Sequence, residues 1–226
     1  MKKYYYLFIV LLIGSNAFAN TNHYKSITKI EMDVFRNGEK IGFSNYFFKH
    51  KNNEMEVKNN TEFKVKLLGV NLLSIKSNSV EKYKNNKLVS FNSNTIQNNK
   101  KKYVNLKVNE DNNKFIINGS SFKGETKNNK VIGNWWNTNI LSATSQISPL
   151  SGSIKEQTVK LIKKEIVIIN DRSYDAIKFK LKSKNQDLPE DKKLDFDIWL
   201  DPKGGIIIKI SYERMGKWEY ILNNYE

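Results

Sequence analysis

The chain of 226 residues contains no cysteine. This absence excludes disulfide bonds, thiolate nucleophiles and cysteine-ligated metal sites together. It also excludes a lipid anchor attached to a signal-peptide cysteine, so we expect a soluble mature protein that is not tethered to a membrane. Export is compatible with the absence, because an oxidising compartment permits disulfides without requiring them.

Arginine is scarce although the formal net charge is +15. The 38 basic residues include only three arginines, Arg36, Arg172 and Arg214, and the rest are lysine. Nucleic-acid sites favour arginine because its planar guanidinium makes bidentate contacts. The lysines are spread evenly along the chain, which is typical of solvated strand faces. We therefore expect no nucleic-acid partner.

Familiar catalytic patterns are also missing. The two histidines, His23 and His50, have no serine, aspartate or second histidine at a useful spacing. The sequence contains neither the Gly-x-Ser-x-Gly elbow of serine hydrolases nor a phosphate-binding glycine loop. We therefore predict no catalytic residue, no metal site and no cofactor, and we expect a protein that is not an enzyme.

The N-terminus has the three zones of a secretory signal in the right order. Lys2 and Lys3 give a positive start, an apolar run covers residues 7–13, and Ala17 and Ala19 supply small residues for cleavage. A membrane anchor is the alternative, but about eleven apolar residues fall short of the roughly 20 that span a bilayer. We predict a signal peptide at 1–19, cleavage after Ala19, and a single periplasmic domain at 20–226 with no membrane span.

Period-two alternation of apolar and polar residues dominates the remaining chain, as in strands with one buried face. Between Met55 and Leu67 every second residue is apolar or threonine, interrupted only by Asn59, and the intervening residues are Glu, Lys and Asn. The same alternation recurs at 30–34, 104–108, 177–181, 194–200, 206–212 and 218–222.

Short turn signals separate these runs, among them Asn37-Gly38, Asn52-Asn53 and Asn85-Asn86. Asparagine and glycine tolerate the left-handed backbone of tight hairpins, which join antiparallel neighbours. We predict an all-β fold, an antiparallel meander of about 10–12 strands. Because long strands twist, we expect a strongly curved open sheet or half-barrel.

Residues 131–152 break the alternation and predict an irregular loop with a short helix. The segment is too apolar for a solvated linker. We favour a plug that covers the open face of the sheet, and the alternative is a mobile lid over a ligand cavity. The candidate ligand-contacting residues of this segment are Trp135, Trp136, Ile140, Leu141 and Leu150.

One pair of acids is a weak candidate for a polar site. On a strand, Asp195 and Asp197 share a face with Trp199. Paired carboxylates beside an aromatic ring occur in sugar-cleaving sites. The alternative, which we favour, is a solvated strand face on which Lys192, Lys193 and Lys209 neutralise the acids.

Several segments together show a resemblance to a known family. They are the runs 34–42, 65–70, 87–91 and 135–137, and the run Asp197-Ile198-Trp199-Leu200-Asp201. Their order and spacing resemble a family of uncharacterised exported β-rich bacterial proteins, a domain of unknown function found mainly in alphaproteobacteria. The family is distantly similar to periplasmic half-barrels that carry lipid or lipoprotein. The resemblance implies a curved antiparallel sheet and brings no catalytic residues.

Three functions are compatible with the sequence. The first is a non-enzymatic periplasmic carrier of a lipid or other hydrophobic ligand. The second is an interaction or scaffold protein that binds another envelope protein. The third, least favoured, is a hydrolase acting through Asp195 and Asp197. A continuous apolar cavity under residues 131–152 would favour the carrier, and a filled core would favour the scaffold.

Overall fold

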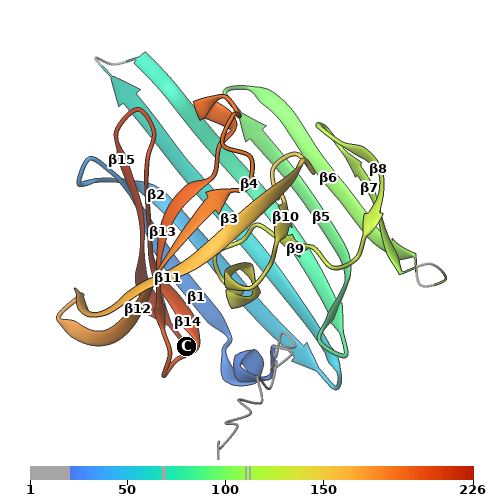
Figure 1. Ribbon diagram of the computed structural model, residues 1–226, viewed down its shortest axis with the longest axis horizontal. Helices are drawn as coiled ribbons and strands as arrows, with labels where there is room; N and C mark the ends of the chain where they lie inside the picture. Colours follow the sequence, from blue (N-terminus) through green and yellow to red (C-terminus); the bar gives the residue numbers. More distant parts are fainter. Residues whose placement is uncertain (1–20, 68–69, 110, 112) are drawn as a thin grey trace, which may run out of the picture.

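A computed structural model describes residues 21–67, 70–109, 111 and 113–226. The expected signal peptide lies outside the described residues. Fifteen strands form one sheet (Figure 1). In chain order the elements are η1 (Thr21–Ser26), β1 (Lys29–Arg36), β2 (Glu39–Lys51), β3 (Glu54–Leu67), β4 (Val70–Lys84), β5 (Lys87–Gln97), β6 (Lys100–Asn109), β7 (Lys114–Gly119), β8 (Lys123–Lys127), β9 (Val131–Ile132), η2 (Thr138–Leu141), β10 (Ser145–Ile147), β11 (Ile154–Ile169), β12 (Arg172–Ser183), η3 (Glu190–Lys192), β13 (Asp195–Asp201), β14 (Ile206–Glu213) and β15 (Lys217–Tyr225).

The strand order is 8-7-6-5-4-3-2-1-15-14-13-12-11-10-9. The chain builds the sheet outward from β1 to β8, crosses to the opposite edge at β9, and returns strand by strand until β15 pairs with β1. All pairings are antiparallel except that of β9 with β10. The predicted antiparallel meander is confirmed, and the sheet stays open rather than closing into a barrel. The predicted strand number was too low, because β9 and β10 have only two and three residues and β8 contains no apolar residue, so none of the three shows the alternation.

Asparagine-rich hairpins explain why neighbouring strands pair. Asn85-Asn86, Asn98-Asn99 and Asn170-Asp171 have positive φ at both positions. Two such residues form the two-residue turn whose twist matches that of antiparallel strands. The turn signals in the sequence therefore lie at the tight hairpins that make consecutive strands antiparallel neighbours.

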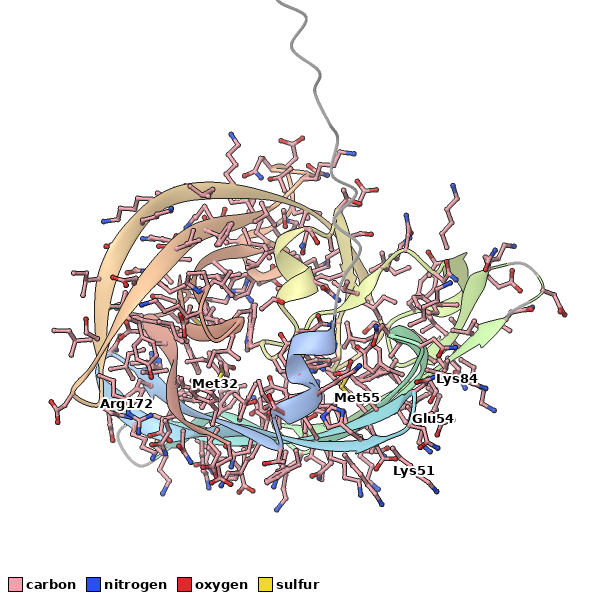
Figure 2. The ribbon with its side chains drawn as sticks, turned by 90° about the horizontal axis from the view of Figure 1, so that it is seen from below. Met32, Lys51, Glu54, Met55, Lys84 and Arg172 are labelled. Carbon is pink, nitrogen blue, oxygen red and sulfur yellow. The ribbon has the colours of Figure 1, made fainter. Side chains whose placement is uncertain are left out.

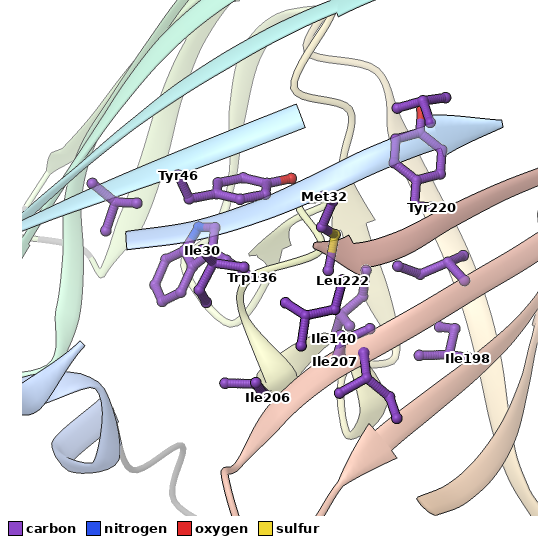
Figure 3. Close-up of a cluster of buried hydrophobic side chains, with 14 of the residues drawn as sticks. Ile30, Met32, Tyr46, Trp136, Ile140, Ile198, Ile206, Ile207, Tyr220 and Leu222 are labelled. Carbon is purple, nitrogen blue, oxygen red and sulfur yellow. The ribbon is translucent and has the colours of Figure 1, made fainter. Parts of the chain in front are cut away.

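The curl of the sheet encloses its apolar face (Figure 2). In β3, Met55, Val57, Phe63 and Val65 are buried, and the lysines and glutamates between them are exposed or half-buried. The alternation read from the sequence thus marks the inner and outer faces. Figure 3 shows the main core, where Ile30 and Met32 of β1 face side chains of β13, β14 and β15.

Residues 131–152, hereafter the plug, lie inside this curl. The plug contains β9, η2 and β10 and is otherwise irregular, as predicted. Trp136, Ile140 and Ile147 are fully buried. The end of the plug packs against β7 so closely that a Cβ on Gly119 would lie 2.6 Å from the carbonyl oxygen of Ser151. Glycine is therefore required there for the plug to reach the sheet.

Candidate binding pocket

A band of polar side chains interrupts the apolar inner face of β2 to β5. The cross-strand register places Ser44 opposite Thr61, Thr61 opposite Ser77, and Ser77 opposite Thr95. The adjacent row places Asn59 opposite Ser79 and Ser79 opposite Ser93. We call the two rows the hydroxyl band: Ser44, Asn59, Thr61, Ser77, Ser79, Ser93 and Thr95.

The members of the band bond mainly to one another. The hydroxyl oxygens of Ser44 and Thr61 lie 2.7 Å apart, as do those of Ser77 and Thr95. Asn59 Nδ2 donates to Ser44 Oγ at 3.2 Å. Buried hydroxyls are costly unless they are hydrogen-bonded. Ser79 Oγ has no hydrogen-bond partner within the described part of the chain.

A pocket of about 210 Å³ lies over part of this band. Ser44, Thr61 and Ser77 form its floor, and Asn134 and Gln146 of the plug contribute amide groups from the other side. Each of these groups can accept or donate a hydrogen bond to a ligand without bringing a net charge. The polar part of the pocket therefore suits a neutral ligand group.

Aromatic side chains form a second wall of the pocket. The ring centroid of Trp135 lies 5.0 Å from that of Phe196 and 6.3 Å from that of Tyr220, and Phe63 and Tyr46 also line the pocket. Burial raises the pKa of Tyr46 to about 12, so its hydroxyl is neutral at physiological pH. The pocket thus joins an aromatic wall to a hydroxyl floor.

Lys155 of β11 is the charged residue among those that line the described pocket. Its Nζ donates to the backbone oxygen of Lys192 at 2.8 Å. Burial lowers the pKa of Lys155, and the nearby Arg214 lowers it further. Lys155 is thus a basic side chain in a lining that is otherwise made of uncharged groups.

Glu81 anchors the plug over the sheet. This carboxylate on β4 is only 1% exposed. It accepts hydrogen bonds from Trp136 Nε1 at 2.8 Å, from Asn134 Nδ2 and from Tyr83 OH at 2.6 Å. Burial raises its pKa, and the three hydrogen bonds oppose the rise. Tyr24 OH, in turn, donates to the backbone oxygen of Trp136 at 2.6 Å.

The candidate residues of the plug separate into two groups. Trp135 and Leu150 line the pocket. Trp136 and Ile140 are fully buried, and Leu141 packs against the same core cluster. The last three hold the plug in place and do not border the pocket.

Asp195 and Asp197 lie on the outer face with Trp199, as the alternation indicates. Lys180 bridges both acids, and Lys178 lies 3.1 Å from Asp197. Burial would raise the pKa of Asp197, but the hydrogen bonds from Lys180 and Lys178 outweigh it and hold that pKa below its ordinary value. The neutralising lysines come from β12 rather than from Lys192, Lys193 and Lys209, because β12 places Lys180 and Lys182 directly opposite the acids. Lys209 of β14 lies opposite Trp199 instead and pairs with Glu219 at 2.8 Å.

Trp199 belongs to the same outer cluster, and its ring contacts lysine and glutamate side chains of neighbouring strands. The Nζ atoms of Lys178 and Lys209 lie 4.6 Å and 5.3 Å from its ring centroid, and its Nε1 donates to Glu165 at 2.8 Å. Lysine nitrogens at these distances make cation–π contacts with the ring. The two acids and the indole ring therefore already bond to neighbouring side chains, and together they form a network of ion pairs and cation–π contacts on the protein surface.

The sequence matches the family described as "Domain of unknown function (DUF6134)" over residues 32–223. The chain belongs to the DUF6134 family. No curated protein matches the sequence. The expected membership of a β-rich family of unknown function is confirmed, and DUF6134 is that family.

The DUF6134 chain is similar in structure to a solved protein, the β-barrel-like protein of domain of unknown function DUF1849 from Brucella abortus. The two share 10% sequence identity with a TM-score of 0.60, and the similarity covers 88% of this chain and 97% of the other. At this identity the similarity concerns the fold.

The described residues of this DUF6134 protein contain neither a long apolar helix nor a metal-binding cluster. No helix in the described ranges is long and apolar enough to cross a membrane. No group of three or more His, Asp or Glu side chains is arranged there to hold a metal ion. The pocket itself offers an aromatic surface, uncharged hydrogen-bonding groups and the amine of Lys155, which can bind a small molecule by packing and hydrogen bonds.

Proposed function

We propose that this protein is a periplasmic, non-enzymatic binding protein whose ligand occupies the pocket between the hydroxyl band and the plug. One observation carries the proposal: the same pocket is lined by an aromatic group and by a hydroxyl group. The aromatic residues are Trp135, Phe196 and Tyr220, and the hydroxyl residues are Ser44, Thr61 and Ser77. Ligand sites combine an apolar lining with a few placed polar groups. The N-terminal signal read from the sequence supports export.

The pocket sets the ligand's size and chemistry. A volume of about 210 Å³ is below the roughly 300–1,000 Å³ of pockets that enclose a drug-sized molecule. The pocket therefore takes a compact amphiphile, or the end of a larger one. The apolar part packs on the aromatic wall, and a neutral hydroxyl-bearing part bonds to the floor. This narrows the hydrophobic-carrier hypothesis to ligands with such a polar group.

Titration of the mature protein with octyl glucoside, below its micelle concentration, tests the proposal. This probe joins a short apolar chain to a ring with several hydroxyls. Thr61→Val removes a floor hydroxyl at nearly constant shape, and Trp135→Ala removes one ring from the aromatic wall. We expect each change to weaken binding by about tenfold, which corresponds to about 1.4 kcal/mol. Thr126→Val on β8, outside the pocket, is the matched control.

Calorimetry separates the outcomes. Binding by the wild type and Thr126→Val, weakened in the two pocket variants, supports the proposal. Absence of binding for both octyl glucoside and a fluorescent fatty acid would overturn it, as would binding that is equal in all four proteins. The second candidate function, interaction with an envelope protein, is favoured by a different surface, the free edge of β11.

A further inference from the structure

The long strand β11 is paired with β12 along most of one edge, but only a short part of its other edge has a partner strand within the described residues. Its inner neighbour β12 pairs with it from Gln157 to Ile169. On the other edge, β10 pairs only with Ile154, Lys155 and Glu156. From Thr158 to Ile168, no strand within the described ranges pairs with that second edge. Figure 1 shows β11 crossing the front of the molecule as this long strand.

The unpaired stretch is unusually apolar for a solvent-facing strand. Leu161, Ile162, Ile166 and Ile168 are 60%, 50%, 69% and 73% exposed. They are four of the nine large apolar side chains exposed among the described residues, and they lie within eight positions of one strand. A long exposed edge with apolar side chains is a template for pairing with another chain. The clustering therefore distinguishes this edge from isolated exposed residues elsewhere.

A bulge divides the edge into two parts. The register with β12 shifts between Leu161 and Lys163. Bulges and lysines are common devices that protect sheet edges from unwanted pairing. After the bulge, residues 163–169 pair with β12 without a further shift, and seven residues are enough for a typical strand. The regular docking segment is therefore residues 163–168.

Charge determines which partner the edge can accept. Lys164, Ile166 and Ile168 share one face of the strand by alternation. Neither Lys160 nor Lys164 has a carboxylate within 4.0 Å among the described residues, whereas Lys163 is paired with Glu165 at 2.7 Å. A second copy of the chain would bring the same lysines to the edge and add to a net charge of +15. A different chain with carboxylates would neutralise them.

We propose that the free edge of β11 binds an extended segment of another protein that carries two apolar side chains flanked by carboxylates on one of its faces. The segment adds a strand to the sheet, so its backbone bonds to the unpaired groups of residues 163–168. On the face that carries Lys164, Ile166 and Ile168, the two apolar side chains of the segment pack on the isoleucines, and a carboxylate lies opposite Lys164. This interaction is independent of ligand binding in the pocket, since Lys164, Ile166 and Ile168 do not line it.

Peptide titration of the full mature protein tests the inference. The probes are the fluorescent peptide Asp-Thr-Val-Thr-Val-Thr-Asp, which places its valines and aspartates on one face in either strand direction, and the matching peptide with lysine in place of aspartate. We expect the acidic peptide to bind at least about tenfold more tightly. The double variant Ile166→Glu with Ile168→Glu should lose this binding, and Lys164→Glu should shift the preference toward the basic peptide. Ile96→Glu, at an exposed position of the interior strand β5, is the control.

The outcomes are distinct. Preference for the acidic peptide that is lost in the double variant and retained in Ile96→Glu supports the inference. Equal binding of both peptides, or binding unaffected by the double variant, overturns it. Analytical ultracentrifugation provides the other decisive result: self-association of the wild type that the double variant abolishes would make a second copy the occupant and would overturn the proposed heterologous partner.

Discussion

Trp136 Nε1 donates to Glu81 Oε1 at 2.8 Å, and both side chains are buried. The two residues are 55 positions apart in the sequence, one in the plug and one on β4. Because Asn134 and Tyr83 bond to the same carboxylate, one acid satisfies donors from the plug and from the sheet. The plug is therefore fastened at a defined point.

Removal of the carboxylate is expected to loosen this attachment. Glu81→Leu leaves the donors of Trp136, Asn134 and Tyr83 without their acceptor, and each unpaired buried donor costs about 1–3 kcal/mol. We expect a loss of at least about 3 kcal/mol in the free energy of unfolding. Glu81→Gln keeps an oxygen for Trp136 and Asn134 and should lose roughly 1 kcal/mol or less. Urea denaturation measures both, and equal stability of the two variants would contradict the anchoring role.

The same residue predicts a pH dependence of stability. Burial raises the pKa of Glu81 above its ordinary value of 4.5. The folded protein therefore binds this proton more tightly than the unfolded chain does, and the stability contributed by Glu81 falls as pH rises from about 4.5 through the folded pKa. Asp197, whose pKa is lowered, acts in the opposite direction. The difference in stability between wild type and Glu81→Gln, followed from pH 4 to 8, isolates the effect of Glu81; a difference that is constant with pH would contradict it.

The contact between the plug and β7 gives a steric prediction. In Gly119→Ala the new Cβ would lie 2.6 Å from the backbone oxygen of Ser151, so backbone has to move. Overpacking of this kind typically costs about 1–3 kcal/mol. We expect a lower melting temperature and faster proteolysis within the plug. Lys123→Ala, at an exposed position on β8, should change neither property, and a Gly119→Ala protein as stable as the wild type would exclude the close approach.

Replacing the two acids of the outer face, Asp195 and Asp197, is expected to change the free energy of unfolding only slightly. Asp195→Asn combined with Asp197→Asn breaks exposed or half-exposed pairs with Lys178, Lys180 and Lys182. Such pairs contribute about 1 kcal/mol or less each. We expect octyl glucoside binding to be unchanged in this double variant. Loss of octyl glucoside binding would contradict this expectation and would indicate that the two acids take part in ligand binding.

The sequence was sufficient to predict the meander because period two is a local property of each strand. It could not reveal the hydroxyl band, since the alignment of Ser44, Thr61, Ser77 and Thr95 depends on the register of four strands. Asn59 was the visible signal: the apparent interruption of β3 is a member of the band. Glu81 was missed because a lone acid between Val80 and Lys82 resembles a solvated residue.

The free edge of β11 was also hidden in the sequence. The bulge between Leu161 and Lys163 breaks the alternation, and Ile166-Val167-Ile168-Ile169 has no polar residue between its members. A continuous apolar run of this length is typical of a strand buried on both faces. Only the sheet order shows that most of one edge of this strand has no partner strand within the described part of the chain.

The most direct test of the proposed function is to map octyl glucoside onto the protein by nuclear magnetic resonance. We expect amide shifts to concentrate at Ser44, Thr61, Ser77 and Trp135, which surround the pocket. In Trp135→Ala, about ten times more octyl glucoside should be needed to produce the same shifts at Ser44, Thr61 and Ser77. Shifts that are absent from these four residues, or that concentrate on β11 instead, would contradict a ligand site between the hydroxyl band and the plug.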